Sequence, residues 1–300
     1  MKPAIGLIGV GLMGHGIARN ILKHGYKLTV LEHPGNRPLD ELLSLGVSTR
    51  TAAADVAQNS DVVILCVTGT PQVEEVLTAA NGVLAGLRPR SIVVDCSTTI
   101  PASTIRMAAQ VEAAGGRFID APMTRSVQQA HDGTLNLLVG GTPEIVEEVR
   151  PVLACFAENI TPVGGIGAGH RMKLLHNFVA IGFMSLLAEA AACAQHTNVP
   201  AEVLVDVLAS GGGGIALERL KPYLLSRDAS ALQFFIANGL KDINYYREMA
   251  QDTNSAREIA DAVAATLAGA VEAGAGQKML PELVSCLADA GAVRKQARSA

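Results

Sequence analysis

Residues 4–14 read AIGLIGVGLMG, an apolar run that passes directly into three closely spaced glycines. The run 4–10 is typical of a buried β-strand, and residues 12–24 have the spacing of an amphipathic helix. A Gly-x-Gly-x-x-Gly pattern between a strand and a helix indicates a dinucleotide-binding turn, because the glycines allow a tight bend and a close approach of backbone N–H groups to phosphate. The residues expected to hold the dinucleotide here are Gly9, Gly11, Leu12, Met13 and Gly14. The pattern alone is weak evidence, and the alternative interpretation is an ordinary glycine-rich turn.

An acidic residue closes the next apolar run. Glu32 ends residues 27–32 and lies 18 positions after Gly14. A carboxylate at this point accepts hydrogen bonds from ribose hydroxyls and repels the 2′-phosphate of NADP. We therefore expect NAD as the cofactor, with NADP as the alternative, because His33 and Arg37 add positive charge nearby.

Short runs rich in Val, Ile and Leu recur through the first half of the chain. They lie at 4–10, 27–32, 62–67, 91–95, 117–121, 135–139 and 159–163. Helix-period segments lie between most of them, at 12–24, 71–80, 101–114 and 143–156. Continuous apolar strands that alternate with helices are typical of a parallel sheet covered on both faces. The short connections around residues 120–135 allow the last strands to turn back antiparallel.

The pattern changes after about residue 165. An Ala-rich sequence with helical spacing continues to the C-terminus, with breaks at 198–200, 211–214, 226–230 and 274–276 and no convincing strand. The first of these helices, expected over 169–197, would be roughly 40 Å long. The sequence predicts an α/β Rossmann-type domain over 1–164 and an all-α domain over 165–300, joined by this long helix.

Composition excludes several classes of protein. Hydrophobic residues make up 49% of the chain and charged residues 17%, with a net charge of −4. This balance argues against a disordered chain and against a nucleic-acid partner. The most apolar stretch, 178–188, is shorter than the roughly 20 residues of a membrane span. We expect no membrane association.

The five cysteines are widely spaced and form no Cys-x-x-Cys pair. Only Cys193 has a histidine close in sequence, His196, and two ligands do not complete a zinc site. We expect no metal. Buried reduced thiols, and an N-terminus that passes straight into the first apolar run without a signal sequence, favour the cytoplasm.

A lysine and an asparagine share one face of the long helix. Lys173 and Asn177 are four residues apart, and the apolar run 178–188 follows them. A partly desolvated ammonium has a lowered pKa, which suits proton transfer. Alternatively, Lys173 is a helix-end lysine that extends to solvent.

Two segments place hydroxyl groups where predicted strands end. Residues 95–99, DCSTT, begin at the last residue of the fourth run, at the edge where a parallel sheet binds ligands. Their hydroxyls could bind an amide or carboxylate group of a ligand. Alternatively, Ser97 or Thr99 caps the next helix.

Residues 120–126, DAPMTRS, place Arg125 between Thr124 and Ser126. Arg125 either binds an anionic group or is a surface arginine. Lys241-Asp242, taken alone, is consistent with a solvated pair.

Taken together, these motifs resemble the β-hydroxyacid dehydrogenase family across essentially the whole chain. The matching segments are 9–18, 120–141, 167–177 and 241–242, in the family's order. The resemblance implies that Lys173 is the general acid/base and that Asn177 orients the substrate. It also implies that Thr98 lies near the nicotinamide or the substrate and that Lys241 lies at the cofactor edge of the cleft.

The chain departs from the family pattern at two loops. Val67-Thr68 stands where Leu-Pro is usual in the cofactor loop. Thr124-Arg125-Ser126 replaces the usual Ser-Gly-Gly, and the sulfolactaldehyde reductases of the same family similarly have an arginine there. The second departure puts the standard substrate in question.

The resemblance implies hydride transfer between NAD(H) and a small anionic hydroxy acid or its aldehyde, bound between the two domains. Alternative substrates are sulfonated aldehydes or succinic and glyoxylic semialdehydes. A non-catalytic scaffold and an imine reductase are less favoured, because such relatives usually lack the lysine. The apolar helix and Ala-rich faces suggest a homodimer or homotetramer.

Overall fold

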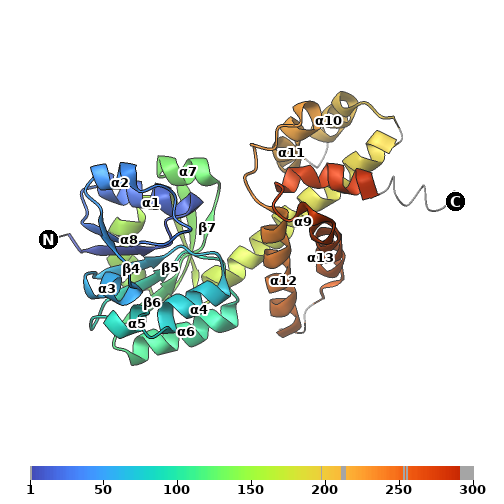
Figure 1. Cartoon of the computed structure of the whole chain (residues 1–300). Helices are drawn as coiled ribbons and strands as arrows, with labels where there is room; N and C mark the ends of the chain where they lie inside the picture. Colours follow the sequence, from blue (N-terminus) through green and yellow to red (C-terminus); the bar gives the residue numbers. More distant parts are fainter. Residues whose placement is uncertain (1, 197, 211–213, 253, 255, 291–300) are drawn as a thin grey trace. The chain divides into compact units, whose positions relative to one another are not determined.

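The computed structural model describes residues 2–196, 198–210, 214–252, 254 and 256–290. The chain forms two compact units that divide between Lys173 and Leu174. We call residues up to Lys173 the sheet unit and those from Leu174 onward the helical unit (Figure 1).

The sheet unit contains one nine-stranded sheet. Its strands are β1 Ile5–Ile8, β2 Leu28–Leu31, β3 Ser48–Arg50, β4 Val62–Leu65, β5 Ile92–Asp95, β6 Arg117–Asp120, β7 Met123–Thr124, β8 Leu135–Gly140 and β9 Ala157–Gly164. Their order is β3-β2-β1-β4-β5-β6-β8-β7, and β9 also pairs with β8. Strands β1 to β6 are parallel, whereas β8 is antiparallel to β6 and β7 and parallel to β9.

Helices cover both faces of this sheet, as the continuous apolar strands predicted (Figure 1). One buried cluster joins the strands to side chains of α1, α2, α7 and α8. A second cluster joins the opposite face to α3, α4, α5 and α6. The bounds are α1 Leu12–Lys23, α2 Asp40–Ser44, α3 Ala53–Gln58, α4 Thr70–Thr78, α5 Val83–Gly86, α6 Pro101–Ala113, α7 Val127–Asp132 and α8 Pro143–Leu153.

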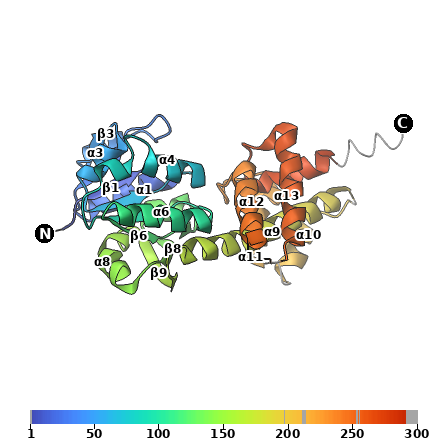
Figure 2. The same cartoon turned by 90° about the horizontal axis from the view of Figure 1, so that it is seen from below.

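Helix α9, Ala168–His196, begins in the sheet unit and continues without interruption into the helical unit (Figure 2). The helical unit has a buried core of its own, built largely from Ala, Leu and Ile side chains. Its further helices are α10 Ala201–Ala209, α11 Gly214–Ser226, α12 Ile236–Asp252 and α13 Glu258–Ala270, followed by a π-helical turn Val271–Ala275, a 3₁₀ turn Leu280–Glu282 and a helical segment at 283–290.

The predicted fold class is confirmed, and each of the seven predicted strands corresponds to an observed one. Two strands were missed. β3 is a polar, mostly exposed segment of three residues, and β7 has only two residues, so neither carries an apolar pattern. Thr197 and residues 211–213, which we assigned to a helix end and a break, lie outside the described residues.

The division into domains at 164/165 stays a prediction. It falls before α9, whereas the compact units divide within this helix. In the part of the chain that the structure describes, no helix is long and apolar enough to span a bilayer.

Candidate active site

The predicted cofactor residues follow parallel strands. β1, β4, β5 and β6 are neighbours and run in the same direction. Their carboxyl ends therefore lie along one edge of the sheet, where open α/β sheets bind ligands. The glycine turn follows β1, Val67-Thr68 follows β4, and Thr98 follows β5.

The three glycines have different structural roles. Gly9 has φ +99°, a left-handed conformation that favours glycine. A Cβ at Gly14 would lie 1.9 Å from the carbonyl oxygen of Gly9, so this position must lack a side chain for α1 to pack against the turn. Gly11 differs, because a Cβ there would meet nothing within 4 Å. The backbone at Gly11 therefore faces open space, as close approach by a phosphate requires.

The start of α1 suits an anion. Gly11 is the N-cap, no side chain caps the first turn, and that turn contains no acidic residue. Backbone N–H groups at such a helix start favour negative charge. The residues of this turn therefore fit the pyrophosphate of a dinucleotide.

Asn36, which the sequence analysis missed, braces the glycine turn. Its Oδ1 accepts a hydrogen bond of 3.3 Å from the N–H of Val10, and its Nδ2 donates one of 2.8 Å to the carbonyl of Leu31. The N–H of Arg37 also donates to the carbonyl of Val10 at 2.9 Å. The loop after β2 thus holds the turn after β1. A lone Asn in a glycine- and proline-containing loop gives no sequence signal for this role.

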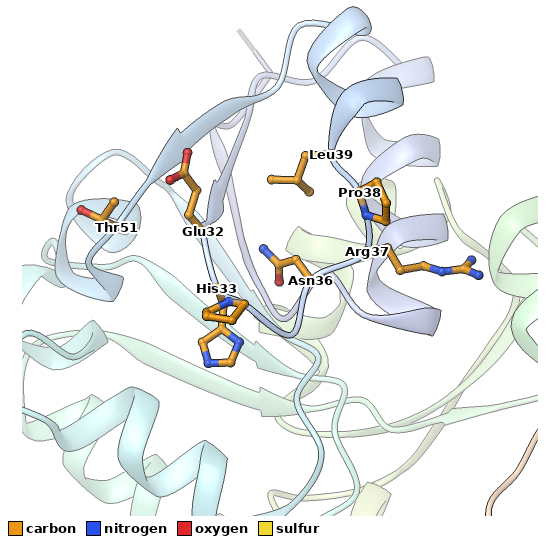
Figure 3. Close-up of a pocket in the computed structure, with 8 residues that line it drawn as sticks. Glu32, His33, Asn36, Arg37, Pro38, Leu39 and Thr51 are labelled. Atoms are coloured by element: carbon orange, nitrogen blue, oxygen red, sulfur yellow. The ribbon is translucent and has the colours of Figure 1, made fainter.

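An open hollow of about 580 Å³ lies beyond the end of β2 (Figure 3). It is lined by Glu32, His33, Pro34, Asn36, Arg37, Pro38, Leu39 and Thr51. Glu32 and Arg37 extend to opposite sides of it (Figure 3). Its place beside the glycine turn, and its lining with one carboxylate, one guanidinium and one imidazole, fit the ribose end of a dinucleotide.

The loops after β4 and β5 are tied together by hydrogen bonds. The N–H of Val67 donates to Oγ of Ser97 at 3.1 Å, and the N–H of Ser97 donates to Oδ1 of Asp95 at 2.9 Å. Thr98, the next residue, is half-buried. Ser97 therefore connects two loops and does not cap α6, where no side-chain cap hydrogen bond is formed.

Asp95 is a buried carboxyl with one unsatisfied oxygen. It is fully buried, and its Oδ2 has no hydrogen-bond partner among the described residues. Burial raises the pKa of Asp95 to about 6, and the hydrogen bonds from Ser97 offset this only in part.

We expect Asp95→Asn to stabilise the protein at pH 7.5. Between about pH 4 and pH 6 the folded state binds more protons at Asp95 than the unfolded state, so the free energy of unfolding falls as pH rises. Asn cannot ionise, so the gain should be about 2–3 kcal/mol at pH 7.5 and below about 1 kcal/mol at pH 4. Urea unfolding at both pH values measures it. Asp228→Asn is the control, because hydrogen bonds from Ser230 lower the pKa of this exposed carboxyl; an equal gain in both variants would contradict the expectation.

The predicted substrate loop follows β6. Thr124 is buried, and its Oγ1 accepts a hydrogen bond of 3.2 Å from Nδ2 of Asn136. Ser126 is the N-cap of α7 and forms a capping box with Gln129. These contacts give Ser126 a structural role in addition to the predicted one.

Arg125 has a partner in the structure. Its Nη1 lies 2.5 Å from Oε2 of Glu158 on β9 and also donates to the carbonyl of Thr134. Its φ of 80° is left-handed, which is uncommon outside glycine. The guanidinium is thus already paired with a carboxylate.

Asp120, at the end of β6, holds the start of α9. Its Oδ1 accepts a hydrogen bond from the N–H of Gly167 at 2.7 Å, and its Oδ2 accepts one from the N–H of His170 at 2.8 Å. Gly140 and Gly169 leave room for this contact, since a Cβ on either would lie within 2.8 Å of the carboxylate. Lys173 follows in the next turn and is half-buried.

In the helical unit, Asn177 is held by a residue that the sequence analysis did not assign. Its Nδ2 donates to Oδ2 of Asp242 at 2.6 Å, and both side chains are buried. Oδ1 of Asp242 lies 3.0 Å from Nζ of Lys241, which lies 5.5 Å from the ring centre of Tyr245. Lys241-Asp242 is therefore not a solvated pair. The adjacent acidic residue in that motif was the available signal.

The predicted residues fall into two groups. The sheet unit holds Gly9, Gly11, Leu12, Met13, Gly14, Glu32, His33, Val67, Thr68, Thr98, Thr124, Arg125, Ser126 and Lys173. The helical unit holds Asn177 and Lys241. Within the described residues, no cluster of His, Cys, Asp and Glu is arranged to hold a metal ion; the side chains of Cys193 and His196 lie outside the described ones.

Comparison with known families gives two matches that together span most of the chain. Residues 4–165 match the NAD-binding domain of 6-phosphogluconate dehydrogenase. Residues 167–287 match the NAD-binding region of NADP-dependent 3-hydroxyisobutyrate dehydrogenase.

Individual relatives agree with these matches. The chain is 34% identical to 3-sulfolactaldehyde reductase of Escherichia coli K12, over 70% of each chain. It is also 34% identical to NAD-dependent L-serine dehydrogenase of Pseudomonas aeruginosa, over 84% of this chain and 86% of that one. Among solved structures, 3-hydroxyisobutyrate dehydrogenase of Mycobacterium tuberculosis with L-serine superposes with a TM-score of 0.84 at 25% identity, covering 96% of this chain and 99% of that one.

Proposed function

Because the chain belongs to the β-hydroxyacid dehydrogenase family and is an NAD(P)-dependent oxidoreductase of hydroxy acids, we propose that Lys173 is its general acid/base. The observation that carries this proposal is the pair of hydrogen bonds that Asp120 accepts from backbone N–H groups at the start of α9. They fix the helix turn before Lys173 to the carboxyl edge of the sheet, where the glycine turn also lies. An amine fixed at this edge suits proton transfer to a substrate oxygen.

When bound, the nicotinamide supplies or accepts the hydride. In the reductive direction the Lys173 ammonium donates its proton to the carbonyl oxygen, which becomes the hydroxyl. In the oxidative direction the Lys173 amine removes the hydroxyl proton. Asn177 orients the same oxygen, with its amide held by Asp242, and Thr98 and Thr124 contact the remainder of the substrate. Lys241 contacts the cofactor. Such orientation supplies up to roughly 7–11 kcal/mol of the barrier reduction.

We propose NAD as the preferred cofactor. Glu32 lines the hollow beside the glycine turn and opposes a 2′-phosphate, whereas His33 and Arg37 are the groups that would accept one. The relative named NAD-dependent L-serine dehydrogenase also favours NAD.

We expect Glu32→Gln to change this preference. Removal of the carboxylate should raise kcat/KM with NADP relative to NAD about tenfold, equivalent to about 1.4 kcal/mol. Initial rates with both cofactors measure the ratio. Glu112→Gln, which removes an exposed carboxylate from α6, controls for the loss of one charge. An unchanged ratio in Glu32→Gln would mean that Glu32 does not face the ribose.

The proposed substrate is a small hydroxy acid or its aldehyde that carries a carboxylate or sulfonate. The Thr124-Arg125-Ser126 loop favours the sulfonate, as does the similarity to 3-sulfolactaldehyde reductase. Glu158 competes with the substrate for Arg125. NAD- and NADP-linked oxidation of L-serine, 3-hydroxyisobutyrate, glycerate, 4-hydroxybutyrate, threonate and 2,3-dihydroxypropane-1-sulfonate tests the assignment, and no turnover of any anionic compound would refute it.

Two substitutions should move the KM for an anionic substrate in opposite directions. Arg125→Gly removes a charge-assisted hydrogen bond, which should raise KM about 10–100-fold. Glu158→Gln releases the guanidinium from its partner and should lower KM. Folding of Arg125→Gly should be little affected, because glycine relieves the left-handed φ and the pair that it loses is partly exposed. Equal KM values in both variants would exclude Arg125 from the site.

We further propose a homodimer or homotetramer in the cytoplasm. Exposed apolar side chains follow one stripe of α9, at Leu175, Val179, Phe183 and Leu186. Their spacing suits burial against a second copy. Light scattering during size-exclusion chromatography measures the mass; a strictly monomeric mass would contradict this.

A further inference from the structure

The strongest feature not used by the proposed mechanism is the ring of His170, which is fully buried at the start of α9. A histidine that has no contact with water must have a partner for each ring nitrogen. His170 has such partners, and they come from the segment that follows β5.

The ring connects α9 to the loop that carries Thr98. Nε2 lies 3.1 Å from the carbonyl oxygen of Ser97. Nδ1 lies 2.9 Å from Oγ1 of Thr99 and 2.8 Å from Oγ1 of Thr104. The ring therefore contacts the residues on both sides of Thr98, while its own backbone N–H is bonded to Asp120.

These contacts place a hydrogen on one ring nitrogen. A carbonyl oxygen only accepts, so Nε2 carries a hydrogen, whereas Nδ1 faces two threonine hydroxyls that can donate to it when the ring is neutral. Burial lowers the pKa of His170 and the positive charge of Lys173 acts in the same direction, although Asp120 and the hydrogen bond to the Ser97 carbonyl oppose them. Oδ2 of Asp120 and Oδ2 of Asp95 lie 3.6 Å and 3.9 Å from Nδ1 and Nε2, beyond hydrogen-bond distance. The lowered pKa and the distance from both carboxylates favour a neutral ring, and its contacts brace the start of α9 against the segment after β5.

We propose that His170 is a positioning residue that fixes the helix turn carrying Lys173 against the loop carrying Thr98. This role rests on the proposed function of Lys173 as the general acid/base. His170 would then set the position of the lysine relative to the reacting atoms. Asp120 holds the backbone of the helix start through two hydrogen bonds. The ring adds a second attachment, on the side of the β5 loop, and the two attachments together restrict rotation of the helix start about its axis.

The test compares three substitutions in the full-length protein. His170→Leu keeps the volume and removes both ring contacts, whereas His170→Gln offers a donor to Ser97 and an acceptor to a threonine hydroxyl. We expect kcat to fall about 10–100-fold in His170→Leu, with the Kd for NADH within about twofold of wild type, and most of the kcat to return in His170→Gln. Ser91→Ala is the matched control. It also removes a buried hydrogen bond, from Ser91 to the carbonyl of Ser60, but Ser91 lies just before the start of β5, away from the loop that follows this strand.

Amide hydrogen exchange over residues 166–174 gives a readout that does not depend on activity. Exchange there should accelerate in His170→Leu and stay slow in His170→Gln and Ser91→Ala. If exchange accelerates but kcat stays at the Ser91→Ala value, the role is only structural and the proposal fails. If neither quantity changes, the brace does not exist. Should His170→Leu not fold, Thr104→Val removes one Nδ1 contact and is read by the same criteria, with a smaller expected effect.

The catalytic role of Lys173 and the positioning role of His170 are tested by different variants. If Lys173→Ala retains full turnover, the proposed function fails. The exchange measurement then still decides whether His170 fixes the start of α9. If Lys173→Ala is inactive but His170→Leu retains wild-type kcat, only the inference about His170 is overturned.

Discussion

Replacement of Lys173 by Ala is expected to lower kcat by about 10²–10⁴-fold, because acid/base catalysis contributes a factor of that size. The dinucleotide should still bind, since the glycine turn and the hollow at Glu32 are far along the chain from α9 and do not use the lysine. Single-turnover rates, measured with an anionic substrate that the wild-type enzyme converts, report the chemical step. Titration of NADH fluorescence reports the affinity for the dinucleotide.

Lys173→Arg is a useful companion variant. It preserves the positive charge, but a guanidinium does not release its proton near neutral pH. We expect it to be nearly as slow as Lys173→Ala. Recovery of turnover in Lys173→Arg would indicate that Lys173 binds an anion and does not transfer a proton.

The glycine turn should respond differently at two neighbouring positions. Gly14→Ala places a Cβ 1.9 Å from the carbonyl oxygen of Gly9, so the helix or the turn must move. We expect a loss of about 1–3 kcal/mol in the free energy of unfolding, with loss of dinucleotide binding. Gly11→Ala meets nothing within 4 Å, so folding should be unchanged while the Kd for the dinucleotide rises about 10–100-fold.

Urea unfolding and fluorescence titration of the two variants measure these quantities. Gly269→Ala in α13 is the control, because a Cβ there also meets open space but lies in the helical unit. It should change neither quantity. If Gly11→Ala binds the dinucleotide normally, the open space at Gly11 is not where the phosphates approach.

The core of the fold was predictable because it depends on local pattern. Buried parallel strands must be apolar throughout, so runs such as 62–67 were recognisable, whereas β3 is polar and mostly exposed and gave no signal. The glycine turn was predictable for a similar reason, since backbone geometry at Gly9 and Gly14 restricts the residue type.

The site was less predictable because its supports join residues distant in sequence. Asp120 and His170 are separated by 50 residues, and Asn177 and Asp242 by 65. Periodicity cannot reveal such pairs. Arg125 illustrates the same limit. Its partner Glu158 lies on β9, 33 residues later in the chain, and occupies the guanidinium that the sequence assigned to an anionic group.

The unbroken course of α9 fixes the spacing between Lys173 and Asn177. Lys173 closes one compact unit and Asn177 belongs to the other, yet the helix between them is unbroken. Their separation along the axis is therefore about 6 Å, because the rise of the α-helix sets it and loop conformations elsewhere do not affect it. Insertion of a single residue between them would swing one side chain by about 100° around the axis. Length variation should therefore be tolerated in the surface loops of this enzyme but not within these few positions.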